Sequence, residues 1–146
     1  MRNNINTIRM IASVLTLVML LFYTSCSKWN YNEVKNIQEV KVPCSSITEQ
    51  QHIISDSISY YSMLDTNNCT PLQIDFSQKT LLGKYTSGTG CTIEFKRQLY
   101  INEKDKESLY VITLKEKGLC KKQDESMNWI IVPKISSDYK VTFKIK

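Results

Sequence analysis

From about residue 70 onward, apolar and polar residues alternate with the period of two that is typical of half-buried β-strands. The alternation predicts strands at 72–76, 93–101 and 139–145, and the short run WIIV at 129–132 predicts another. The run Leu109–Leu114 is apolar on both faces, which is typical of a central strand, and we expect the predicted helix to cover one side of it. The last of these strands carries lysines on one face, and we interpret them as protection of a sheet edge against aggregation.

A helical period precedes the strands. Ser46 and Glu49 fit a capping box, and the following apolar residues recur at helical spacing, so the pattern predicts a helix over Thr48–Met63. The apolar face of this helix contains Ile54, Ile58 and Tyr61. His52, the sole histidine, lies on the opposite side of the helix, so we expect it to be solvent-exposed and not a general base. The predicted fold class is α+β, with one amino-terminal helix packed on a mainly antiparallel β-sheet or partly open barrel.

The amino terminus has the order of a secretory signal peptide. Arg2 and Arg9 precede the apolar run Met10–Tyr23, and two small residues then lead to Cys26. The run holds about fourteen residues, fewer than the roughly twenty that a helix needs to cross the hydrocarbon core, which disfavours the alternative of a permanent transmembrane anchor. The cysteine after small residues resembles the lipobox of bacterial lipoproteins. The resemblance implies cleavage before Cys26 and a lipid on its thiol.

This processing predicts three regions: a signal peptide at 1–25, a tether at 26–36 and a single disulfide-stapled α+β domain at 37–146. Ser27 follows Cys26, which resembles lipoproteins sorted to an outer membrane. No acidic cluster follows Cys26, so we expect the periplasmic face of that membrane and not the cell surface.

The cysteine count supports the lipid assignment. Of five cysteines, Cys26 takes the lipid, and the remaining four are an even number that fits two disulfides in an oxidising compartment. We favour Cys91 with Cys120, which flank two predicted strands, and Cys44 with Cys69, which would tie the ends of the predicted helix; the other two connectivities stay open. No two of them have the Cys-x-x-Cys spacing of a metal site, so we expect neither metal nor cofactor.

Charge and motifs exclude several functional classes. The formal net charge of +5 falls by two when the signal peptide with its two arginines is removed, and lysines alternate with acids, as at 103–107. This mixture indicates solvated turns and strand ends, so we expect no nucleic-acid partner. The small-residue run Ser87–Gly90 has neither the spacing nor the lysine of a phosphate loop.

Candidate chemistry is limited to carboxylates and aromatic residues. A carboxylate-based hydrolase would need two acids in one pocket, and the candidates are Asp75, Glu94 and Asp105. We interpret Asp75 as a polar strand position or a cap on neighbouring amides. A glycan or peptide platform would use aromatic side chains, with candidates Trp29, Tyr60, Tyr61 and Trp129, of which we place Tyr61 and Trp129 in the core. We therefore expect no enzyme.

The segment LQIDFSQKTLLG at 72–83, with Thr89 and Gly90 before the next strand, resembles the carboxy-terminal domain of the protease-complex subunit PrcB and related small envelope lipoproteins. The similarity covers about Ile47–Lys146. It implies a helix packed on antiparallel strands, in a lipoprotein that accompanies a surface protease and cuts nothing itself. Cys91 and Thr92 replace a further glycine and an aromatic residue of the family pattern, and no catalytic residue carries over.

Together these observations predict a membrane-tethered, non-enzymatic accessory lipoprotein that binds another envelope protein. The alternatives are a glycan- or peptide-binding module and a small protease inhibitor that presents the turn-rich stretch Gly83–Gly90.

Overall fold

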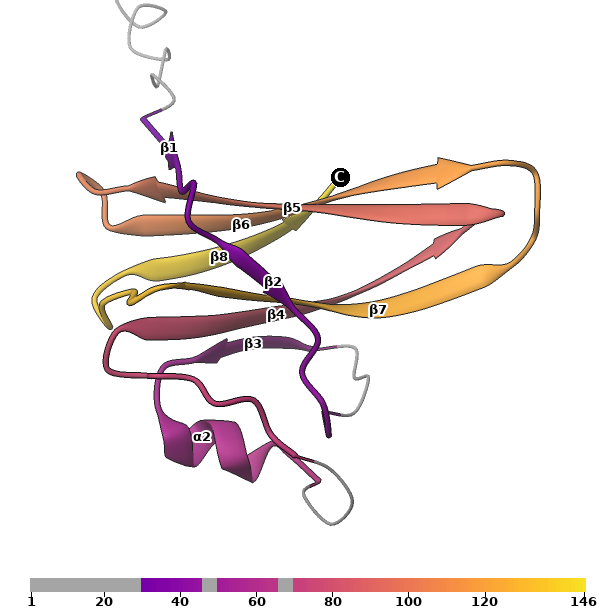
Figure 1. The fold of residues 1–146 in the computed structure, drawn as a ribbon. Coiled ribbons are helices and arrows are strands. Elements are labelled where there is room, and N and C mark those ends of the chain that lie inside the picture. The colour runs from indigo at the N-terminus through magenta and orange to yellow at the C-terminus, as the bar shows by residue number, and fades with distance from the viewer. Residues whose placement is uncertain (1–29, 46–49, 66–69) are drawn as a thin grey trace, which may run out of the picture. The chain divides into compact units, whose positions relative to one another are not determined.

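Two four-stranded β-sheets contain most of the residues that the structure, a computed structural model, describes: 30–45, 50–65 and 70–146 (Figure 1). They belong to a compact unit that spans Tyr31–Lys146. In spatial order, the first sheet consists of β1 (Asn32–Glu33), β5 (Thr92–Asn102), β6 (Glu107–Lys117) and β8 (Lys140–Ile145). The second sheet consists of β2 (Gln38–Val40), β7 (Gln123–Pro133), β4 (Lys79–Thr89) and β3 (Gln51–Ile54).

The sheets pack face to face as a sandwich. All neighbouring strands are antiparallel except β6 and β8, which are parallel. The interior contains residues from both sheets and from the β7–β8 connection: Leu82, Leu99, Tyr110, Ile112, Ile130, Val132 and Ile135. The Tyr110 hydroxyl crosses this interior and donates to the backbone carbonyl of Asn128, at 2.9 Å. The core is therefore mainly apolar, with one direct polar link between the sheets at this point.

A third layer covers the outer face of the second sheet. The short helix α2 (Ser57–Ser62) and the segment 70–78 lie against it, and Tyr60 is the buried residue of the helix. This outer cluster is centred on Val42, Ile54, Tyr60, Leu81 and Trp129. Because the sheet is covered on both faces, sequence neighbours such as Leu81 and Leu82 are both fully buried.

The predicted α+β class is wrong, because the described residues are mostly β and their one helix has six residues. Residues 51–54, expected inside the helix Thr48–Met63, form β3. The helix begins only after Asp56, whose carboxylate accepts from the Ser59 amide at 2.8 Å. The predicted capping box at 46–49 lies outside the described residues. The apolar face was also misassigned, since Ile58 is 82% exposed and Tyr61 47%.

Other parts of the pattern are confirmed. β6 lies between β5 and β8 as a central strand, and β8 ends its sheet. The helix expected to cover β6 instead packs on the other sheet. The stretch Gly83–Gly90, expected to be turn-rich, instead falls almost entirely within the long strand β4, and no strand forms at 72–76. The protease-inhibitor hypothesis therefore loses the loop on which it depended.

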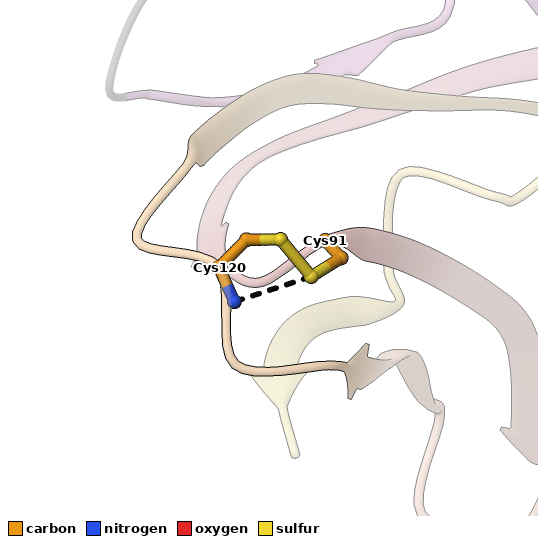
Figure 2. Close-up of a disulfide and its surroundings, with 2 residues drawn as sticks. All are labelled: Cys91 and Cys120. Atoms are coloured by element: carbon orange, nitrogen blue, oxygen red, sulfur yellow. Dashed lines mark hydrogen bonds between the residues drawn. A yellow bond between two sulfur atoms is a disulfide. The ribbon is translucent and has the colours of Figure 1, made fainter.

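The disulfide Cys91–Cys120 forms as predicted (Figure 2). It joins two sheet-to-sheet connections: Cys91 lies between β4 and β5, and Cys120 between β6 and β7. The Cys120 amide also donates to the Cys91 sulfur, at 3.2 Å. Gly118 lies directly against this sulfur and has a φ of +80°, which favours glycine. Cys44 is disulfide-bonded too, whereas its predicted partner Cys69 lies outside the described residues.

Candidate functional site

The sandwich is open along the side between β3 and β8, which we call the open side. Each of these strands ends its sheet in the described part of the chain. Ile53 of β3 is the register partner of the core residue Leu82, and Ile145 of β8 is the partner of the core residue Ile112. Directly paired residues share a face of the sheet, so both isoleucines point toward the interior. They are nevertheless 50% and 47% exposed.

The opposite side of the sandwich is closed by the chain itself. Strands β1 and β2 pair with β5 and β7, so residues 32–40 cross from the first sheet to the second; Figure 1 shows this indigo segment passing over both. Between the two strands, Val34 and Ile37 pack against the core. This segment includes residues 32–36, which the sequence analysis assigned to the tether. This fold therefore closes one side of the sandwich with an extended segment whose apolar side chains pack against the core.

A depression of about 600 Å³ lies at the open side. Its apolar wall consists of Ile53, Ile135, Tyr139 and Val141. Lys134 also lines it, and its ammonium donates to the carbonyls of Ser55 at 2.6 Å and Phe76 at 2.7 Å. An ammonium has three donors, so one of the three is left for a further acceptor. The depression therefore combines an apolar wall with a cation.

The strand that borders this depression carries a row of lysines. Lys140 and Lys144 project from the outer face of β8, and Lys146 follows the strand. Among the described residues, the ion pairs do not include any of these three amines. Glu107 is the register partner of Lys140, and its carboxylate accepts from the Tyr31 hydroxyl. The β8 edge is therefore basic.

A second depression, of about 540 Å³, lies where β2 ends and the chain leaves β7 at Lys41. Arg97 and Trp129 line it together with Met127, residues 40–42 and Ser45. The Arg97 guanidinium pairs with Glu39 at 2.5 Å. The Nε of Arg97 and the Nε1 of Trp129 are buried N–H groups with no acceptor among the described residues. Two residues that line this depression therefore carry N–H groups that no described residue satisfies.

His52 is not the exposed helical residue that the sequence predicted. It lies on β3 opposite Gly83, and its imidazole packs on the indole of Trp129, with ring centroids 5.3 Å apart. Burial lowers the pKa of this imidazole below its usual value. The prediction failed because His52 belongs to a strand, where its side chain shares a face with Ile54 of the outer cluster.

The three candidate carboxylates have separate structural contacts. Asp75 accepts from the amide and hydroxyl of Ser77, at 3.0 and 2.6 Å, which matches a cap on neighbouring amides. Glu94 pairs with Lys117 at 2.5 Å, and this contact lowers the pKa of its carboxyl. Asp105 accepts from the side-chain amide of Asn102 at 2.7 Å in the β5–β6 turn. Glu94 lies at the other end of that hairpin, paired with Lys115 in the register. The structure does not bring those two together.

The candidate aromatic platform does not form as a surface. Trp129 is 2% exposed, as expected of a core residue, and Tyr60 is fully buried with its hydroxyl accepting from the Leu72 amide at 3.1 Å. Tyr61, which we expected in the core, is exposed. Trp29 and the lipidation candidate Cys26 lie outside the described residues.

The described residues contain neither a helix that could span a membrane nor a cluster of potential metal ligands. None of the helices in 30–45, 50–65 and 70–146 is long and apolar enough to cross a membrane. Over the same ranges, no group of three or more His, Cys, Asp or Glu side chains is placed to hold a metal ion.

Comparison with models of known protein families, with curated proteins and with solved structures finds no match. The resemblance to the PrcB family therefore rests on the residues quoted for it.

Proposed function

We propose that this chain is a lipid-anchored, non-enzymatic accessory protein of the bacterial envelope whose domain binds another envelope protein. The lipid is attached at Cys26, and the domain is held at the outer membrane on its periplasmic side. The signal-peptide pattern and the lipobox resemblance support the anchor. The PrcB-like segment supports an accessory role beside a protease.

The open side of the sandwich is the observation that carries this proposal. Ile53 and Ile145 face the interior and are half-exposed, and Ile53 lines a depression that has an apolar wall. Exposed apolar surface combined with free backbone edges is typical of protein-interaction sites and is a liability when it has no partner. A partner that covers the open side would bury both isoleucines.

The roles of the candidate acids also support a binding protein. Asp75 caps a turn, Asp105 accepts from the side-chain amide of Asn102, and Glu94 is held by Lys117. A carboxylate-based hydrolase needs two acids that face the same substrate. Each of these three side chains instead serves the local structure.

Photo-cross-linking in native envelopes tests the proposal. The full-length tagged protein carries a photoreactive amino acid at Ile53 or at Ile145, and a control carries it at the fully exposed Leu119 in the β6–β7 connection. We expect one defined adduct from both open-side positions and none from Leu119. A Cys26→Ala protein, which cannot take the lipid, should lose most of that adduct. Equal, nonspecific adducts from all three positions would contradict the proposal.

A peptide- or glycan-binding module is the second candidate, and the unpaired N–H groups in the second depression favour it. The test is a screen of glycans and peptides against the wild type and Arg97→Met. Binding that weakens in this variant while the cross-linked adduct persists would place a ligand there. Ligand binding that is unchanged in Arg97→Met would reject the second depression as its site.

A further inference from the structure

Among the described residues, the backbone of β8 presents a free edge at the open side. The Lys140 amide donates to the Lys106 carbonyl and the Lys146 amide to the Ile112 carbonyl, both at 2.9 Å and both toward β6. Backbone groups alternate in direction along a strand, so those of Val141, Phe143 and Ile145 point away from β6. Because β8 ends its sheet, this row of donors and acceptors can pair with an added strand.

The side chains around this edge indicate where an added strand would carry apolar residues. Ile145 and Ile53 leave interior surface uncovered, and Ile53 and Val141 line the depression. On the closed side, an extended segment fills the corresponding position with Val34 and Ile37. A segment that seals the open side in the same way needs an apolar residue at every second position.

The lysines near this edge indicate which polar residues an added strand would carry. An added strand would place its outward side chains beside Lys144 and Lys146, which form no ion pair among the described residues. Acidic residues match these positions. A second copy of the chain, paired through β8, would instead bring two lysine rows together, which is unfavourable.

We infer that the open side receives an extended segment of the partner protein, in which apolar residues alternate with acidic ones, as an additional strand on β8. The inference rests on the proposed function and names the chemistry of the partner. Backbone hydrogen bonds to β8 supply affinity, and the apolar residues that border the depression fix the register. Lys144 and Lys146 select for acidic side chains.

Synthetic peptides test this chemistry directly. The probe alternates isoleucine with glutamate over the length of β8, and a second peptide has lysine in place of glutamate. A third is the glutamate peptide with N-methyl groups along the edge that would pair, which removes backbone donors and leaves side chains unchanged. We expect the glutamate peptide to bind, and the lysine peptide and the N-methylated peptide each to bind about tenfold or more weakly.

Variants of the protein complete the test. Ile145→Pro removes an outward-facing amide without breaking a bond to β6, and Ile145→Val is its matched control because it keeps the amide and the branched side chain. We expect the first to lose peptide binding and the second to retain it. Exchange of Lys144 and Lys146 for glutamate should reverse the preference between the two charged peptides. On binding, the amides of Val141, Phe143 and Ile145 should become protected from hydrogen exchange.

Several outcomes would overturn the inference. Equal binding of the N-methylated peptide would show charge attraction without strand addition, and no binding of the glutamate peptide would remove the site. Sedimentation of a dimer that Ile145→Pro abolishes would assign the edge to a second copy. Tighter binding to anionic phosphatidylglycerol vesicles than to the peptide would assign the lysines to a membrane. If the envelope cross-link persists in Ile145→Pro and in the lysine-exchange protein, the inference fails and the proposed function stands; if no partner is cross-linked, the proposed function itself fails.

Discussion

The indole of Trp129 extends across β4 to the imidazole of His52 on β3, with ring centroids 5.3 Å apart and an interplanar angle of 32°. Gly83 of β4 pairs with both residues and lies between them in the sheet. A Cβ on Gly83 would come within 2.2 Å of the indole Cζ3. The glycine is therefore what allows the tryptophan to cover the strand beside it and reach the histidine.

Gly83→Ala should destabilise the fold by about 1–3 kcal/mol, because the indole must leave its position over β4. Denaturant unfolding at neutral pH measures the loss. Gly88→Ala is the matched control, since it lies in the same strand but its Cβ would first meet the flexible carboxylate of Glu116. Equal losses in the two variants would show that the indole moves at little cost.

Stability should fall as the pH drops from neutral through the range where histidine titrates. Burial lowers the pKa of His52 in the folded state, so the unfolded chain, with a pKa near 6.5, takes up the proton first. The stabilisation is complete above that pH and declines below it, down to the folded pKa. Urea unfolding from pH 7.5 to 5.5 measures the slope, which His52→Gln should remove. A slope unchanged in that variant would assign the effect to other groups.

Replacement of both Cys91 and Cys120 by serine should lower the free energy of unfolding by roughly 3–4 kcal/mol, the entropy of closing a loop of their 29-residue separation. Thermal or urea unfolding of the oxidised wild type and the double variant measures the difference. Reduction of the wild type should cost at least as much, because it also breaks the disulfide of Cys44, and the double variant should respond to reductant only through that second bond. A stability difference below about 1 kcal/mol would show that the connections are held by other contacts.

Tyr110→Phe should cost about 1 kcal/mol, since it removes the hydroxyl that reaches Asn128 across the core while it keeps the ring against Phe143. Burial raises the pKa of this phenol, so it should ionise only when alkali unfolds the protein. Unfolding curves and absorbance titration provide the two readouts. Tyr139→Phe, at a half-buried tyrosine beside the core, is the control and should stay within about 0.5 kcal/mol of wild type.

The pattern identified β5, β6, β8 and the WIIV part of β7, because burial imposes a period of two or an apolar run on these strands directly. It missed β4, which is central in its sheet, and it predicted a strand at 72–76 where none forms. It failed at 51–61, where Ile54, Ile58 and Tyr61 happen to recur at helical spacing while Ile53 and Ile54 lie on opposite faces of β3. It also failed at Gly83, where the lack of a side chain makes room for the indole of Trp129, 46 positions later in the sequence. Local periodicity contains no information about such a partner.

The candidate site was even less accessible to sequence reasoning. Ile53 and Ile145 look like ordinary apolar residues of regular elements, and their exposure follows from which strands end each sheet. The lysines of β8 were correctly placed on an edge, but the depression beside them depends on the β7–β8 connection crossing between sheets. Only the topology brings these parts together.

The position of the disulfide also bears on the order of folding. The β5–β6 hairpin pairs Thr92 with Lys117, so formation of this one local unit already brings Cys91 close to Gly118 and Cys120. Oxidation therefore requires contacts of low sequence separation and none of the long-range pairings between β4 and β7. In an oxidising compartment the bond can form early, and the closed loop then shortens the conformational search by which the second sheet assembles.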